Sequence, residues 1–332
     1  MVCTFGELLL RMSPVLHRRW IAEANMPVYI GGAELNVATA LATWDVPVKY
    51  LTRLPDHYLA REIEQHLQQT GINTAGIQWG GNRVGTYYLP QGTDLKHAGV
   101  IYDRAYSAFW ELQPGTVNWE ALLEGCAWLH WSAITPALNE TLAAVCSEVV
   151  AAARKKGITI SVDLNYRSKL WQYGVQPATV MAPLVQQCDV VMGNLWAAES
   201  LLNIPSPVAE SKGLTRQQLL QAAATSMQAV QHQFPRVRQL AYTFRLEETY
   251  FGVLHDGAEL HASHTYSTGH LVDKVGSGDC FMAGLIYGML RHMPAPHTIN
   301  FAAAAAVGKM AEVGDATRQT VAAIEQRIAT QA

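Results

Sequence analysis

The sequence predicts an α/β fold with a mostly parallel central sheet, helices on both of its faces, and a small β-sheet lid. Short apolar runs rich in β-branched residues alternate with longer segments of helical period, which is typical of parallel strands joined by crossover helices. The chain has 332 residues, of which 49% are hydrophobic and 15% charged, enough to bury a large core. Two stretches interrupt the alternation and predict the additional sheet.

The elements of the main body are expected in the following order. Strands are expected at Val2–Phe5, Val48–Thr52, Ala127–Ser132, Thr159–Leu164, Val190–Met192 and Leu240–Phe244. Helices are expected at Gly32–Trp44, Tyr58–Thr70, Asn139–Lys156, Pro177–Gln187, Thr215–Gln233, Gly278–Arg291, Thr298–Val313 and Thr320–Ala329. Gly157 directly follows three cations, as at a helix C-terminus, where glycine accommodates the left-handed turn and cations face the negative end of the dipole.

The segments 11–30 and 83–108 carry alternating polar and apolar residues with little helical period. Both are expected to form antiparallel strands outside the main sheet. Ligands of open α/β sheets bind beyond the carboxyl ends of the strands, so a β-flap over that edge would act as a lid. We expect one domain, residues 1–332, with these two segments as its lid.

Composition excludes several functional classes. The net charge of −3 gives no footprint for nucleic acid or for an anionic membrane, and there is no 18-residue apolar run. Five scattered cysteines without C-x-x-C spacing predict neither a disulfide framework nor a zinc site, and twelve dispersed histidines show no metal-ligand spacing. Charged residues follow the N-terminus too early for a signal peptide, so a cytoplasmic location is expected.

The most informative motif is DKVGSGD at residues 273–279, directly before a helical apolar run. Its two glycines allow the backbone to approach a ligand, and the N–H groups at the start of the helix favour an anion. A carboxylate at Asp279 is unusual beside an anion unless it accepts the proton of an attacking nucleophile. The motif therefore suggests phosphoryl transfer to a hydroxyl, although Ser277 or Asp279 could also be only the N-cap of a buried helix.

Three motifs agree in order and content with a known family. They are GGAELN at 31–36, VDLNYR at 162–167 and GSGD at 276–279, and together they resemble the ribokinase-like (PfkB) family of sugar kinases over nearly the whole chain. The runs IYDR at 101–104 and DLNYRSKLW at 163–171 resemble the branch that phosphorylates 2-keto-3-deoxygluconate. The resemblance implies a ribokinase-like fold and ATP-dependent phosphorylation of the terminal hydroxyl of a keto-deoxy sugar acid.

The resemblance also implies roles for the residues of the last motif. Asp279 matches the general base that takes the proton of the sugar hydroxyl. Gly276, Ser277 and Gly278 match the backbone anion hole that faces the γ-phosphate, where one preorganised donor is worth roughly 10²–10³ in rate. Asp273 matches the first position of the motif and is expected to organise the loop on the nucleotide side, together with Gly276 and Gly278.

The sugar is expected to contact the segment at 31–36. Gly31 and Gly32 would let hydroxyl groups reach the backbone, and the amide of Asn36 can both donate and accept a hydrogen bond. The alternative is that the glycines form only a strand-to-helix turn and that Asn36 is a surface residue.

The acid group of the substrate is expected to bind arginine, whose planar fork suits a carboxylate. Arg167 and the lid residue Arg104, assisted by Tyr87 and Tyr102, match the positions that hold the substrate in the resembled kinases. The alternative is that Arg104 pairs with Asp103 or another surface acid, and that both tyrosines only pack within the lid.

The nucleotide side departs from the family pattern. The usual Asn-x-x-Glu motif keeps Asn194 but has Ala197 in place of the glutamate, so organisation of Mg²⁺ by that motif is in doubt, while Mg²⁺ on the nucleotide phosphates is still expected. Arg245 could replace a phosphate contact or form a surface ion pair with Glu247 or Glu248. No metal site made by the protein itself is expected.

Two further readings are open. One alternative is a fructokinase or ribokinase that acts on a neutral sugar, although such an enzyme would not need two converging arginines. The other is a non-catalytic sugar-acid sensor on the same scaffold, which would explain why the glutamate of the Asn-x-x-Glu motif is missing. In each case the expected partners are a small sugar or sugar acid and ATP, with no nucleic acid and no membrane. An exposed β-lid also offers an edge for a homodimer.

Overall fold

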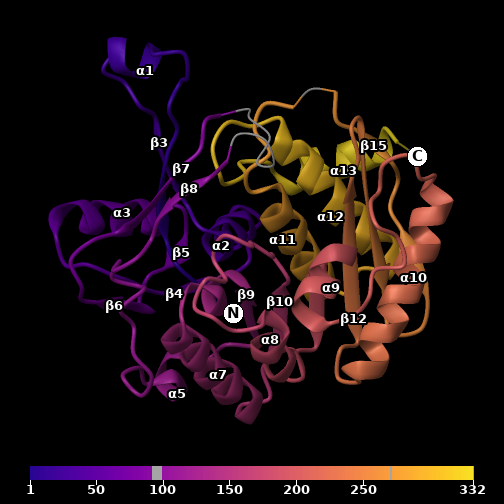
Figure 1. Ribbon diagram of the computed structural model, residues 1–332, viewed down its shortest axis with the longest axis horizontal. Helices are drawn as coiled ribbons and strands as arrows, with labels where there is room; N and C mark the ends of the chain where they lie inside the picture. The colour runs from indigo at the N-terminus through magenta and orange to yellow at the C-terminus, as the bar shows by residue number, and fades with distance from the viewer. Residues whose placement is uncertain (92–98, 270, 332) are drawn as a thin grey trace.

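The computed structural model describes residues 1–91, 99–269 and 271–331, and within them the main sheet has 11 strands (Figure 1). The strands are β1 (Val2–Phe5), β4 (Val48–Leu54), β5 (Ile72–Asn73), β6 (Ile77–Trp79), β9 (Trp128–Ser132), β10 (Thr159–Asp163), β11 (Val190–Gly193), β12 (Gln239–Arg245), β13 (Thr249–His255), β14 (Leu260–Ala262) and β15 (Tyr266–Ser267). Their order is β14-β13-β12-β11-β10-β9-β1-β4-β5, with β15 beside β13 and β6 beside β4. The pairs from β12 through β5 are parallel, and those of β13 with its neighbours are antiparallel.

Helices cover both faces of this sheet (Figure 1). One core lies under α5 (Trp119–Leu122), α6 (Ile134–Leu138), α7 (Glu140–Lys155), α8 (Pro177–Val185), α9 (Leu195–Leu202) and α10 (Arg216–Gln233). The other lies under α2 (Ala33–Thr43), α3 (Tyr58–Gln69), α11 (Ser277–Leu290), α12 (Ala295–Met310) and α13 (Val321–Ala329). The predicted fold class is therefore confirmed, because burying a parallel sheet on both faces requires a helical layer on each side.

All six expected strands and all eight expected helices are present, with ends that coincide with the expected ones or shift by at most three residues. The largest shift is in α12, which begins at Ala295 because Pro296 fits the first helical turn, where no N–H is needed. The sequence reading missed the helices α1, α5, α6 and α9 and the strands β5, β6 and β13 to β15. A β-rich run, Thr249–His255, bounded by Glu248 and by the turn at Asp256-Gly257, was the available signal for β13.

A separate four-stranded sheet, which we call the lid sheet, has the order β3-β2-β7-β8. Its strands are β2 (Leu9–Met12), β3 (Val28–Gly31), β7 (Gly85–Tyr88) and β8 (Ile101–Asp103), and the short helix α1 (Arg19–Ala22) projects from the far end of β2 and β3 (Figure 1). The sequence prediction of antiparallel strands is wrong for one pair, because β2 and β7 run parallel. Both strands follow parallel strands of the main sheet, β1 and β6, and so leave it at the same edge. Residues 92–98 of the expected lid segment lie outside the described residues.

Cys3 and Cys126 form a disulfide bond, which the sequence reading did not expect. The two cysteines lie 123 positions apart in the sequence, and their Cα atoms are brought within 6.1 Å because β1 and β9 are parallel neighbours. Cys146, Cys188 and Cys280 are free and buried. Among the described residues, no helix has both the length and the apolar character needed to cross a membrane.

Candidate active site

Asp279 lies in the first turn of α11, at the edge of the main sheet where the parallel strands end. Its carboxylate accepts a hydrogen bond of 2.7 Å from Nδ2 of Asn36, in α2. The side chain is only 8% exposed. The other side-chain atom of Asn36, Oδ1, is buried and has no hydrogen-bond partner among the described residues. A buried acceptor without a partner is costly, so this position is suited to a ligand that donates a hydrogen bond.

The backbone at Gly276 shapes the loop before this helix. Gly276 is the N-cap of α11 and has a φ of 78°, in the left-handed region that favours glycine. A Cβ there would lie 1.7 Å from the carbonyl oxygen of Asp315, so no other residue fits. Ser277 is buried, and its hydroxyl donates to the carbonyl of Lys274 at 2.9 Å. At Gly278 the nearest atom to an added Cβ would be Met192 Cε at 3.9 Å, which leaves room beside the first N–H groups of the helix.

Two buried carboxyl groups face this edge of the sheet. Burial raises the pKa of Asp279 to about 7, against the hydrogen bond from Asn36, which lowers it. Burial also raises the pKa of Asp163, at the end of β10, to about 8, and the nearby charge of Asp279 adds to the increase. The two groups therefore titrate as an interacting pair close to neutral pH. Perturbed carboxyl groups of this kind are typical of active sites.

Arg167 supplies a positive charge near both carboxylates, since it lowers the pKa of Asp279 and of Asp163. It follows β10 and is partly exposed. Within the described residues it has no carboxylate partner, and its Nη1 donates to the carbonyl of Tyr166 at 3.2 Å. An arginine with a free fork beside a phosphoryl-transfer site can bind an anionic group of a substrate.

Arg104 is placed differently from Arg167. Its Nε and Nη2 both bind Oε2 of Glu7, at 2.7 and 2.6 Å, and the pair is buried. The hydroxyl of Ser107 donates to the other oxygen of Glu7. Neither Asp103 nor a surface acid is the partner, because Asp103 pairs with Arg83. The role of Arg104 in holding a substrate stays a prediction, and its charge is already balanced by Glu7.

A buried network joins the lid sheet to the loop before α11. Arg11, in β2, is fully buried and binds Asp273 Oδ2 at 2.5 Å and Asp315 Oδ1 at 3.0 Å. Asp273 Oδ1 also accepts the N–H of Val275. The hydroxyl of Tyr87, in β7, donates to Asp315 Oδ2. Asp273, which the sequence predicted to organise the loop, thus binds Arg11 and the N–H of Val275. The hydroxyl of Tyr87 already donates its hydrogen bond to Asp315.

The remaining residues predicted on the sugar side lie close to this network. Gly31 ends β3, and a Cβ there would lie 2.2 Å from Oδ2 of Asp315, while Gly32 is the N-cap of α2. They form a strand-to-helix turn that delivers Asn36 to Asp279. The ring of Tyr102 lies 6.5 Å from that of Tyr87. Contact of these residues with a sugar stays a prediction.

Asn194 and Arg245, predicted on the nucleotide side, follow or end neighbouring strands β11 and β12. Asn194 is the N-cap of α9, and its side chain accepts the N–H of Ala197 at 2.9 Å. Arg245 is exposed. The structure therefore brings both to the edge that carries Arg167, since all three strands are parallel.

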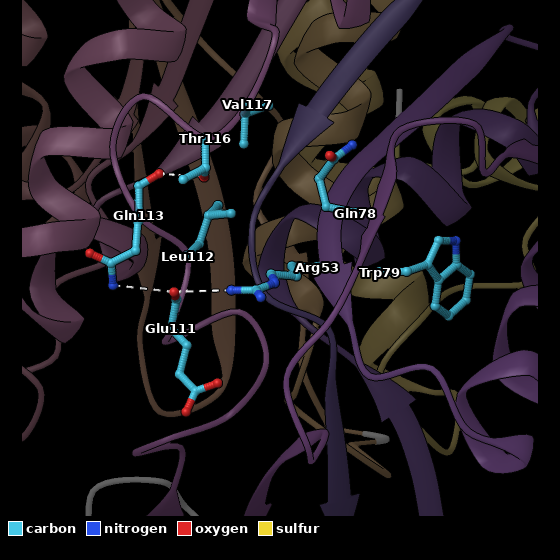
Figure 2. A pocket seen from close by; sticks show the side chains of 8 residues that line it. All are labelled: Arg53, Gln78, Trp79, Glu111, Leu112, Gln113, Thr116 and Val117. Atoms are coloured by element: carbon cyan, nitrogen blue, oxygen red, sulfur yellow. Dashed lines mark hydrogen bonds between the residues drawn. The ribbon is translucent and has the colours of Figure 1, made fainter.

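A cavity of about 330 Å³ lies elsewhere, between β4, β6 and the segment 111–117 (Figure 2). Arg53 Nη1 and Gln113 Nε2 both donate to the carbonyl of Glu111 across it. None of the predicted site residues lines this cavity.

The chain belongs to the pfkB family of carbohydrate kinases, whose family model matches residues 1–320. It is 33% identical to a crystal structure of 2-dehydro-3-deoxygluconokinase from Thermotoga maritima, with a TM-score of 0.89 and coverage of 99% of both chains. A PfkB family carbohydrate kinase from Listeria grayi is 30% identical, with a TM-score of 0.86 and the same coverage. A 2-dehydro-3-deoxygalactonokinase from Haloferax volcanii is 37% identical over 169 residues, which are 51% of this chain and about half (52%) of that protein.

These findings confirm the predicted family, the ribokinase-like fold and the enzyme class, a carbohydrate kinase. Sequence reasoning did not assign roles to Asp163, Arg11, Asp315 or Glu7. Asp163 stood inside a recognised motif, which was the available signal. The other three could not be found from the sequence, because their partners are distant in the chain.

Proposed function

We propose that the protein transfers the γ-phosphate of ATP to the terminal hydroxyl of a keto-deoxy sugar acid, such as 2-keto-3-deoxygluconate. The observation that carries the proposal is the buried Asp279 carboxylate, with a raised pKa, at the start of α11 and near Arg167, which has no carboxylate partner among the described residues. The names of relatives, kinases of dehydro-deoxygluconate and dehydro-deoxygalactonate, support the same substrate class.

The chemistry follows from the positions of these groups. Asp279 accepts the proton of the substrate hydroxyl as that oxygen attacks the γ-phosphorus, and the bond from phosphorus to the bridging oxygen of ADP breaks. The backbone N–H groups of Gly276, Ser277 and Gly278 are proposed to face the transferred group, and Asn36 holds the carboxylate in place. No covalent intermediate on the protein is required, because positioning and charge neutralisation provide most of the catalysis.

Mg²⁺ would enter with the nucleotide. Among the described residues, no group of three His, Cys, Asp or Glu side chains is arranged to hold a metal ion. Phosphate oxygens and water are the ligands that Mg²⁺ prefers when the protein supplies few. Asn194 and Arg245 are the side chains proposed to face the nucleotide.

The test is a coupled ADP-release assay with 2-keto-3-deoxygluconate, 2-keto-3-deoxygalactonate, fructose and ribose. One arginine–carboxylate contact is worth about 1.5–3 kcal/mol, so kcat/KM for a sugar acid should exceed that for fructose by about 10- to 100-fold. Equal kcat/KM for fructose would overturn the acid substrate. It would favour a neutral-sugar kinase, an alternative that the pairing of Arg104 with Glu7 keeps open.

A third outcome concerns catalysis itself. Binding of a sugar acid by calorimetry, without ADP release from any substrate, would identify a sensor on the kinase scaffold and contradict the proposed base.

We also propose that two copies pair through the lid sheet. The lid exposes apolar side chains on its projecting hairpin, on its outer strand β8 and on the turn after that strand, namely Val15, Leu16, Trp20, Ile21, Val28, Ile101 and Tyr106. Exposed apolar clusters of this kind mark protein interfaces. Light scattering of the protein should give twice the chain mass of 36.4 kDa, and a monomer would contradict the pairing.

A cytoplasmic location fits a kinase that uses ATP, although the Cys3–Cys126 disulfide is unusual there.

A further inference from the structure

Lys309 is a lysine with no exposed surface, in the last turn of α12. Lysine is almost never fully buried unless its ammonium is paired. Its position at the C-terminal end of a helix is favourable for a cation, because the helix dipole is negative there. These facts explain why a positive charge is tolerated at this position, but not why the ammonium group contacts residues outside α12.

The ammonium group of Lys309 binds three main-chain carbonyl oxygens. They are those of Asp273 and Glu312, each at 3.4 Å, and that of Gly314 at 2.5 Å. An ammonium has three N–H donors and no acceptor, so the three carbonyls match its capacity. Asp273 is 36 positions earlier in the chain than Lys309. The contact is therefore a link between two loops as well as a helix cap.

Both loops shape the site proposed for phosphoryl transfer. The first loop begins with Asp273 and leads through Gly276 into α11, and the second includes Gly314 and Asp315. The two are packed so closely that a Cβ on Gly276 would meet the carbonyl of Asp315 at 1.7 Å and Cε of Lys309 at 3.4 Å. The carboxylates of Asp273 and Asp315 bind Arg11 on the lid side. Two cations and two carboxylates thus balance in the interior.

Carbonyl oxygens grouped around one point are also the ligands that replace the water shell of a dissolved monovalent cation. We propose that Lys309 acts as a tethered monovalent cation, which fills a carbonyl cage between the two loops and fixes the anion-binding loop without K⁺ or Na⁺ from solution. Lys309 is a positioning residue in this scheme, since it acts through the loop. Two quantities test the proposal. The effect on activity rests on the proposed kinase function, whereas the effect on thermal stability does not depend on that function.

The first experiment uses the unmodified protein. Its kcat/KM and melting temperature are measured in chloride salts of K⁺, Na⁺ and tetramethylammonium at equal ionic strength. Both quantities should be the same in all three salts, because the cage is already filled. A requirement of the unmodified protein for K⁺ or Na⁺ would overturn the proposal, whether or not any variant folds.

The second experiment empties the cage. Lys309→Ala should lower the melting temperature and the activity in tetramethylammonium, and K⁺ or NH₄⁺ should restore both. At a concentration ten times its dissociation constant, the cation should raise the folding equilibrium constant of the variant about tenfold. Lys309→Met fills the cage with an uncharged group and should not respond to K⁺. Loss of stability in Lys309→Ala without recovery in K⁺ or NH₄⁺ would overturn the proposal.

A matched control comes from Lys49, another buried lysine that binds main-chain carbonyls, those of Leu122 and Glu124. These carbonyls lie outside the loops around α11, so Lys49→Ala should lose stability without a K⁺-dependent change in activity. If the protein released no ADP at all, the proposed function would fail, while recovery of the melting temperature of Lys309→Ala in K⁺ would still support the tethered cation.

Discussion

Replacing Asp279 with asparagine should abolish most of the activity and yet stabilise the fold at neutral and alkaline pH. The pKa of this carboxyl group is about 7 in the folded protein, against 3.8 for an unperturbed aspartate. At 1.36 kcal/mol per pH unit, keeping the carboxylate ionised in the folded state costs on the order of 4 kcal/mol above pH 7. Asparagine carries no such charge, and its amide oxygen can still accept the bond from Asn36 Nδ2.

The sign of the pH dependence follows from the raised pKa. Below pH 3.8 the carboxyl group is neutral in both states and its favourable contribution to stability is fully present. As the pH rises toward about 7 the unfolded chain has lost its proton while the folded protein keeps it, so that contribution is progressively lost. The gain in stability of Asp279→Asn over the parent should therefore be small at acidic pH and reach a few kcal/mol above about pH 7.

The assay is urea unfolding of the two proteins across this pH range, together with steady-state kinetics. Loss of a general base should lower kcat by about 10²–10⁴. In the parent protein, kcat/KM should fall as the pH drops below about 7, because protonated Asp279 cannot accept the hydroxyl proton. Asp45→Asn, at an exposed position, serves as the control and should change neither quantity. An unchanged kcat, or a stability gain that does not vary with pH, would refute this reasoning.

Two other substitutions test the charges around the site. Arg167→Ala should raise KM for the sugar acid by the equivalent of about 1.5–3 kcal/mol and leave KM for a neutral sugar unchanged. Arg167→Lys should recover only part of the lost affinity, because lysine lacks the planar fork of arginine. The same rise in KM for both sugars would indicate that Arg167 is structural. Arg11→Met should lower the free energy of unfolding by about 3–5 kcal/mol, since Asp273 and Asp315 stay buried without their shared partner. Urea unfolding measures this loss. Arg61→Met, which removes exposed ion pairs, is the control and should change the free energy of unfolding little. An unchanged unfolding midpoint for Arg11→Met would contradict the network.

Much of the fold could be read from the sequence because strands and helices leave a local pattern. The alternation of apolar runs with helical segments located six of the parallel strands of the main sheet and most of its covering helices, but not the short strands β5 and β6. The direction of β7 in the lid sheet was read wrongly, because the pairing partner of an isolated strand is not encoded in its own residues. The Cys3–Cys126 bond was missed for the same reason, since its proximity comes from the pairing of β1 with β9.

For the candidate site too, local sequence features could be predicted, whereas contacts between distant residues could not. Asp279 could be singled out because two glycines, a serine and a helix start surround it within a few residues, and these local features define an anion site. The expectation that Arg104 and Arg167 converge on an acid could not be checked by sequence spacing, and the structure gives Arg104 a buried partner, Glu7, that lies 97 positions away.

The sequence by itself determined the class of fold, the family and the carboxylate placed at the start of α11, because each depends on periodicity or on neighbouring residues. Only the tertiary structure decided which charges are balanced and which are free. Arg11 meets Asp273 across 262 positions, and Lys309 reaches the carbonyl of Asp273 across 36. Such contacts form when strands and helices pack, and burial then makes each unpaired charge costly enough that its partner is specified by the fold.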